Sequence, residues 1–174
     1  MSLTDAHFVD CAINPDNPAS GSNLYYPTGL THLEGEEVQL LVDGAVVASD
    51  TVSGGAVDGD DGTENRVGLG YISQVKPSKL DVEGMGIALT KRITEAVLSF
   101  YKTLGGQYGP TTDDLDTIPF RTTETDSAPD LFTGVKELHF DGGYEKEGDV
   151  IVYQDQPLPI TVRGLILDLG VYQE

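Results

Sequence analysis

The chain lacks tryptophan, contains one cysteine, and has no long apolar run. The single cysteine, Cys11, excludes both an intramolecular disulfide and a cage of cysteine ligands around a metal. We interpret it as a buried, inert thiol. No stretch reaches the roughly 18 apolar residues of a membrane-spanning helix, and no basic segment precedes a short apolar one. We therefore expect neither a membrane span nor a signal peptide.

Basic side chains are also scarce: ten Lys and Arg stand against 29 Asp and Glu, for a formal net charge of −19. The imbalance is strongest in residues 1–75, where Arg66 is the only base beside these acids: Asp5, Asp10, Asp16, Glu34, Glu36, Glu37, Asp43, Asp50, Asp58, Asp60, Asp61 and Glu64. Such a surface repels phosphate, so we expect no tight binding to nucleic acid. The simpler interpretation of the acidity is solubility. The alternative is a surface past which DNA slides without binding.

What the chain does have is the composition of a globular protein rich in turns. Of its 174 residues, 39% are hydrophobic and 22% charged, which is typical of a folded chain with a core. The 21 glycines and 9 prolines favour short strands separated by turns. We therefore expect one β-rich domain over residues 1–174.

The clearest local pattern is a hairpin. Residues 38–42 and 45–48 are apolar β-type runs joined by Asp43-Gly44, a dipeptide that accepts the positive φ angles of a type I′ turn. Residues 51–57 are a further candidate strand. In residues 66–75 apolar side chains alternate with Gly68 and Gly70, which indicates a strand that bends or that another group approaches closely.

In the last candidate strand, residues 160–171, the apolar side chains switch from one face of the strand to the other. Ile160 and Val162 point one way by simple alternation, whereas Leu165, Leu167, Leu169 and Val171 point the other. The change falls at Arg163-Gly164, so we predict a β-bulge there.

Residues 85–104 fit two structures. As a helix, they place Leu89, Ile93, Val97, Phe100 and Leu104 on one face. As a strand, they are apolar on both faces, as in a buried strand. The spacing of the apolar residues favours the helix, whereas the strand patterns on both sides of this segment favour the strand. The expected fold is thus all-β, an antiparallel β-sandwich or barrel, either without a helix or with one helix near residues 85–104.

The chain carries no recognisable catalytic motif. It has no Gly-x-Ser-x-Gly elbow, and His7, His32 and His139 are far apart with no His-Glu-x-x-His spacing. Glu34 and Glu37 can be nominated as a glycosidase pair, but so can many other acids. We therefore name no catalytic, cofactor-binding or metal-ligating residue and expect a protein that is not an enzyme and needs no cofactor.

The acidic turn at Asp58-Gly59-Asp60-Asp61-Gly62 resembles the start of a calcium loop. Its fifth position is Gly62, where an EF-hand needs an oxygen ligand, so the frame fails. We interpret the turn as a solvated hairpin tip, with a weak Ca²⁺ site as the alternative.

Several segments together are similar to a family of virion proteins of short-tailed phages, described as tail tubular, nozzle-like or stabilisation proteins. They are GLTHLEGEEV at 29–38, VDGAVV at 42–47, Lys91-Arg92-Ile93, IPFR at 118–121, LFTG at 131–134 and QDQPLPITV at 154–162. The chain departs from the family at Glu36-Glu37, where a basic residue is common, and in its acidity.

This resemblance implies a non-catalytic structural role in the virion, after assembly in the cytoplasm of the bacterial host. It implies a fragment matching the C-terminal portion of a longer chain, with a strand over residues 91–103. Expected partners are identical subunits in a ring and other tail or portal-adjacent proteins. Two alternatives stay open. One is a small β-sandwich that binds carbohydrate or calcium through the Tyr25-Tyr26 loop and the turn at residues 58–61. The other is a hydrolase of cell-wall polysaccharide.

Overall fold

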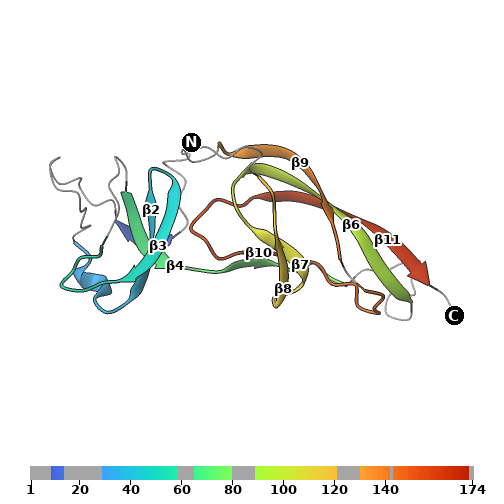
Figure 1. Ribbon diagram of the computed structural model, residues 1–174, viewed down its shortest axis with the longest axis horizontal. Coiled ribbons are helices and arrows are strands. Elements are labelled where there is room, and N and C mark those ends of the chain that lie inside the picture. The colour runs from blue at the N-terminus through green and yellow to red at the C-terminus, as the bar shows by residue number, and fades with distance from the viewer. Residues whose placement is uncertain are drawn as a thin grey trace. The chain divides into compact units, whose positions relative to one another are not determined.

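The computed structural model describes residues 9–13, 29–58, 65–79, 89–120, 130–141 and 143–172 (Figure 1). Within them the protein is all-β, with three antiparallel sheets that do not close into a barrel. The helical structure of this part is one 3₁₀ turn, η1 (Thr31–Leu33), and no helix in it has the length and apolarity needed to cross a membrane. The all-β prediction is confirmed. The loop that carries Tyr25 and Tyr26 lies outside the described residues.

The chain divides into two compact units, and neither is continuous in sequence. Unit 1 contains residues 1–72, 121–131 and 155–159, and unit 2 contains residues 73–120, 132–154 and 160–174. The expectation that residues 1–174 behave as one domain stays a prediction.

Unit 1 contains one four-stranded sheet in the order β1-β4-β2-β3, made of β1 (Val9–Ile13), β4 (Asn65–Gly70), β2 (Glu37–Val42) and β3 (Ala45–Thr51). Its core consists of buried aliphatic residues: Leu30, Leu33, Val38, Leu40, Val52, Val57 and Val67. The predicted hairpin is confirmed, because Asp43 and Gly44 join β2 to β3 with φ angles of 49° and 82°.

Two expectations for unit 1 are wrong. Residues 51–57 do not form a further strand: β3 ends at Thr51, and Ser53 and Ala56 form only an isolated bridge across a turn. Cys11 is exposed rather than buried. It lies where β1, at the edge of its sheet, loses register with β4, and its φ of 51° bends the strand at this point.

Unit 2 contains two sheets. The first has the order β5-β10-β7-β8, made of β5 (Ser73–Val75), β10 (Ile151–Gln154), β7 (Gln107–Thr111) and β8 (Asp114–Thr117). The second has the order β11-β6-β9, made of β11 (Val162–Tyr172), β6 (Thr90–Thr103) and β9 (Phe132–His139). Both contribute to one core: Ile93, Ala96, Leu98, Phe100, Tyr108, Ile118, Leu138, Phe140, Val150 and Val152. Unit 2 is therefore a two-layered β-sandwich.

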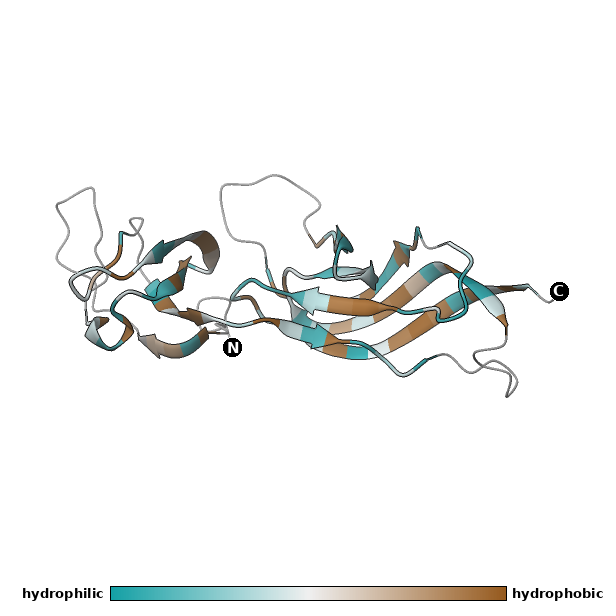
Figure 2. Cartoon of the chain, turned by 90° about the horizontal axis from the view of Figure 1, so that it is seen from below, coloured by the Kyte–Doolittle hydropathy of each residue, from teal (hydrophilic) through white to brown (hydrophobic). Residues whose placement is uncertain are grey.

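Residues 90–103 are strand β6, so the helical alternative is wrong for them; residues 85–88 lie outside the described part. Ala96, Leu98 and Phe100 are fully buried, and the residues between them lie on the opposite face. Figure 2 shows this alternation as bands of apolar and polar residues along the long strands of unit 2. The helix-like period arose because β6 is apolar on both faces, and pairing with strands on either side decides its structure.

The bulge predicted at Arg163-Gly164 is confirmed. The ladder between β11 and β6 shifts register between Val162 and Gly164. As a result, Val162 and Leu165 both pack against the core, although they are an odd number of positions, three, apart in the strand. Without the extra residue one of the two would point outward.

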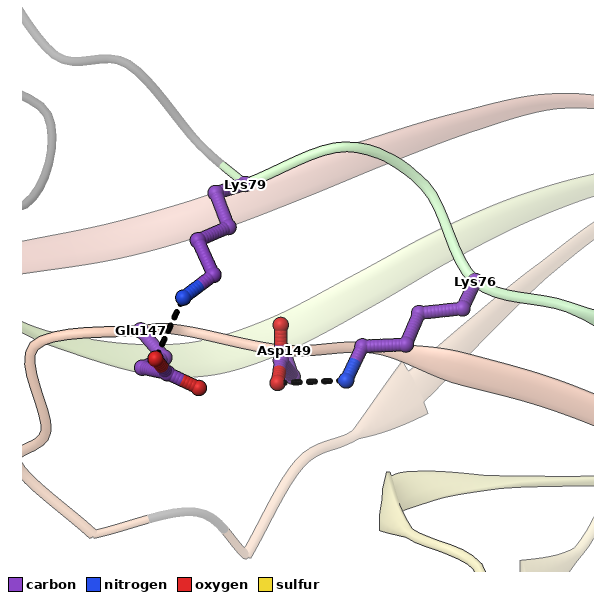
Figure 3. Close-up of polar contacts among 4 residues, drawn as sticks. All are labelled: Lys76, Lys79, Glu147 and Asp149. Carbon is purple, nitrogen blue, oxygen red and sulfur yellow. Dashed lines mark hydrogen bonds and ion pairs between the residues drawn. The ribbon is translucent and has the colours of Figure 1, made fainter.

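Two ion pairs connect the segment after β5 to the segment before β10 (Figure 3). Lys76 Nζ lies 2.6 Å from Asp149 Oδ2, and Lys79 Nζ donates to Glu147 Oε1. The hydrogen bond to Glu147 raises the pKa of Lys79 above its ordinary value. A raised lysine pKa stabilises the fold below the unfolded pKa, and this contribution is lost as the pH rises through the folded pKa. Lys79 therefore carries its positive charge at neutral pH.

The hairpin of β7 and β8 gives a test of the packing in unit 2, because Gly109 of β7 lies against Asp114 of β8. A Cβ on Gly109 would lie 2.0 Å from the carbonyl oxygen of Asp114, a backbone atom that cannot swing away. We expect Gly109→Ala to lower the free energy of unfolding by about 1–3 kcal/mol, measured by urea denaturation. Gly143→Ala is the matched control, since no atom lies within 4 Å of its added Cβ, and it should change stability by less than about 0.5 kcal/mol. Equal free energies of unfolding for Gly109→Ala and Gly143→Ala would contradict the close contact between Gly109 and the Asp114 backbone.

Candidate functional site

Unit 1 has a hollow on the surface of its sheet, of about 490 Å³. The start of β2, the second half of β3, the end of β4 and the segment at residue 155 form its walls. The lining residues are Glu37, Gln39, Ser49, Gly70, Tyr71, Ile72 and Asp155. All of them belong to unit 1.

The Gln39 side chain lies flat against β4 inside this hollow. A Cβ on Gly70 would lie 2.3–2.7 Å from the three end atoms of the Gln39 carboxamide, so the glycine leaves the space that the amide fills. Gln39 Nε2 donates to the backbone oxygen of Asp155 at 2.9 Å. A carbonyl oxygen only accepts, so this bond fixes which end of the amide is nitrogen. Gln39 Oε1 is enclosed and has no hydrogen-bond partner among the described residues.

Beside it, Glu37 and Ser49 form a polar pair across β2 and β3. Ser49 Oγ donates to Glu37 Oε1 at 2.5 Å. The ladder between the two strands shifts register between Val38 and Leu40, which places an extra residue of β3 at this point. The hydroxyl proton of Ser49 is thus used within the hollow, whereas Glu37 keeps a second oxygen.

An apolar rim completes the hollow. Tyr71 and Ile72 follow β4 directly and are 40% and 62% exposed. Exposed aromatic and aliphatic side chains beside carboxylates are common at binding surfaces. No lining residue carries a positive charge, while Glu37 and Asp155 carry negative ones.

Glu34 and Glu37, which the sequence analysis considered as a glycosidase pair, bind different groups. Glu34 Oε1 and Oε2 accept hydrogen bonds from the backbone nitrogens of Gly54 and Gly55, at 2.8 and 2.7 Å. The two glycines have φ angles of 63° and 73°, so their N–H groups form a concave turn around the carboxylate. Glu37 is bound to Ser49 instead. Only Glu37 of the nominated pair lines the hollow.

The other residues considered from the sequence are scattered. His32 Nε2 lies 3.4 Å from the Cys11 oxygen, and His139 Nε2 lies 3.2 Å from Asp141 Oδ1, both at exposed positions. Within the described ranges, no three His, Cys, Asp or Glu side chains gather as they would around a metal. Asp58 donates its backbone N–H to Asp50 Oδ2. Residues 59–62 of the acidic turn, as well as His7, lie outside the described part.

Sequence reasoning did not find the hollow, but it found one sign of it. The alternation of Gly68 and Gly70 predicted a close approach, and this is confirmed at both positions. A Cβ on Gly68 would lie 2.7 Å from the Asp10 oxygen, and one on Gly70 would meet Gln39. Asp155 carries no such sign, because 116 residues separate it from Gln39.

A scan against models of known protein families found no match for the chain, and a search of curated proteins found no similar one. Any function must therefore be proposed from the residues of the chain itself.

The Glu34 turn gives a second test. Glu34→Ala removes the acceptor for two backbone N–H groups, so we expect the free energy of unfolding to fall by about 1–3 kcal/mol in thermal or urea denaturation. Glu36→Ala is the control, because no polar contact of the Glu36 side chain is present among the described residues. A loss no larger than in the control would mean that water replaces the carboxylate at no cost.

Proposed function

We propose that the chain is a non-enzymatic structural module of a tailed-phage virion that assembles with copies of itself, as in a tail tube or nozzle. The observation that supports this most is the three-stranded sheet β11-β6-β9 of unit 2 (Figure 1), which has two strand edges and exposed apolar side chains at the centre of its outer face. The order of the family-like segments in the sequence agrees with the proposal.

The two edges of this sheet are β11 and β9. Each pairs with β6 and with no other strand in the described part of the chain. β11 has 11 residues and β9 has 8, so each edge presents a row of N–H and C=O groups. Natural proteins usually shorten or cover such edges, and an uncovered one pairs readily with another chain.

The outer face of the same sheet is apolar at its centre. Ile166 is 69% exposed and lies beside Val97 on the next strand, while Val135 is 58% exposed and lies beside Ser99. Tyr101 is 46% exposed on the same strand as Val97. We call Ile166, Val97, Val135 and Tyr101 the outer patch. Burial of such a patch against a second copy is favourable by roughly 25 cal/mol for each Å² of apolar surface.

Strand directions distinguish two kinds of joint. β11 and β9 both run antiparallel to β6, so they run parallel to each other. A joint in which β11 of one copy extends the sheet of the next at β9 is head-to-tail and closes into a ring if the rotation allows. A joint of β11 with β11 is two-fold and stops at a dimer. The proposed ring requires the joint of β11 with β9, because the joint of β11 with β11 ends at two copies.

The acidity fits a role near DNA without binding to it. We propose that other partners are tail or portal-adjacent proteins of the virion and that the acids repel the phosphates of passing DNA. Solubility alone remains the simpler explanation of the charge.

The assembly is tested by the solution mass from light scattering, over a wide range of protein concentration. We expect species larger than a dimer that grow with concentration and persist at high salt, since the outer patch is apolar. Ile166 lies on the edge strand β11 and in the outer patch, so Ile166→Lys should lower the association constant at least about tenfold where the joint between copies also covers that patch.

Val46→Lys is the matched control for this variant. Val46 is a 37%-exposed valine of unit 1 outside the outer patch, and its substitution adds the same charge. It should leave assembly unchanged. A strict monomer, or a dimer that never grows, would refute assembly into a ring.

Absence of DNA binding is a separate expectation. Fluorescence anisotropy with a labelled DNA duplex at low and physiological salt should give a Kd weaker than the roughly 10⁻⁴–10⁻⁶ M of ordinary non-specific binders. Saturable binding that weakens as salt rises would contradict the role proposed for the acids.

A further inference from the structure

We propose that the hollow of unit 1 receives an arginine side chain of a partner protein. The hollow lies in different residues from the outer patch of unit 2, so the inference goes beyond self-assembly and can fail or succeed independently of it. Its basis is the kind of polar group that the walls present.

The side chains of the walls offer mostly hydrogen-bond acceptors. Glu37 has one oxygen that Ser49 does not use, and Asp155 adds a second carboxylate. Two of the side-chain donors are used, since the Ser49 hydroxyl proton goes to Glu37 and one Gln39 N–H goes to Asp155. The Tyr71 hydroxyl and the second Gln39 N–H are the other side-chain donors of the lining. A sugar hydroxyl needs donors as well as acceptors. A guanidinium has five N–H donors and no acceptor, and so matches these walls.

Two features favour arginine over lysine. A planar guanidinium can donate one N–H to the second oxygen of Glu37 and a parallel N–H to the lone pair of Oε1 that Ser49 leaves, which an ammonium cannot do. Tyr71 provides an exposed ring, and arginine stacks on aromatic faces. Ile72 is apolar and exposed beside it, suited to the methylene stem of a long side chain.

The partner's charge follows from the charge of this chain. Residues 1–75 contain one base, Arg66, and its Nη1 donates to the Asn65 oxygen. With a formal net charge of −19, the chain attracts basic partners and repels its own copies at long range. A basic protein surface is therefore the occupant that charge complementarity favours.

The test uses the full chain and a defined probe, N-acetyl-arginine N-methylamide, followed by amide chemical shifts in NMR. We expect saturable shifts centred on Gly70, Tyr71, Ile72 and Asp155, with millimolar affinity because a single side chain supplies few contacts. The citrulline analogue has the same shape without the charge and should bind about tenfold more weakly or not at all.

Three variants locate the interaction. Glu37→Gln keeps an acceptor for Ser49 but removes the charge, and should weaken binding about tenfold. Gly70→Ala should abolish binding, because its Cβ displaces the flexible end of Gln39 into the hollow. Glu36→Gln removes a neighbouring charge outside the hollow and should change the affinity less than twofold. The amide spectrum of each variant shows directly whether it is folded.

Three outcomes would overturn the inference. They are equal responses to arginine and citrulline probes, equal losses in Glu37→Gln and Glu36→Gln, and shifts spread over the acidic surface instead of the hollow. Shifts in the hollow with a neutral oligosaccharide, and none with the arginine probe, would assign the hollow to a sugar instead.

Discussion

The position of β6 is the constraint on which unit 2 depends. β6 is the central strand of its sheet, and its inward face supplies Ala96, Leu98 and Phe100 to the core. Its outward face carries the centre of the outer patch. One strand thus fixes both the sandwich core and the proposed interaction surface. A change of register by one residue would exchange the two faces, so the register is determined by the core.

The parts of the fold that the sequence predicted are those decided locally. Asp43-Gly44 readily adopts the positive φ angles of a tight hairpin turn. The apolar residues on either side of Arg163-Gly164 have an odd spacing, so both sets reach one core only if a bulge lies between them. The structure of residues 90–103 is decided instead by pairing with strands distant in the sequence, so the local spacing of apolar residues wrongly favoured a helix. Cys11 was misplaced for a similar reason, since its exposure follows from an irregular edge strand. The hollow combines residues 116 positions apart, which no local pattern records.

The scarcity of bases changes how the acids are used. In a chain with ten Lys and Arg, several carboxylates accept hydrogen bonds from N–H and hydroxyl groups instead of forming ion pairs. Glu34 holds the turn at Gly54 and Gly55, and Asp50 accepts from the backbone of Thr51 and Asp58. These contacts add order without cancelling charge. The fold therefore keeps its large negative charge while using part of it as structure.

The retained charge and the apolar outer patch have opposite dependence on salt. Repulsion between highly acidic copies weakens as salt screens it, whereas burial of apolar surface does not. Association of identical copies should therefore be favoured by salt. A guanidinium held by Glu37 would be released under the same conditions, because its attraction is electrostatic. If both surfaces are used, ionic strength separates them: the joint between copies and the contact with a basic partner respond in opposite directions.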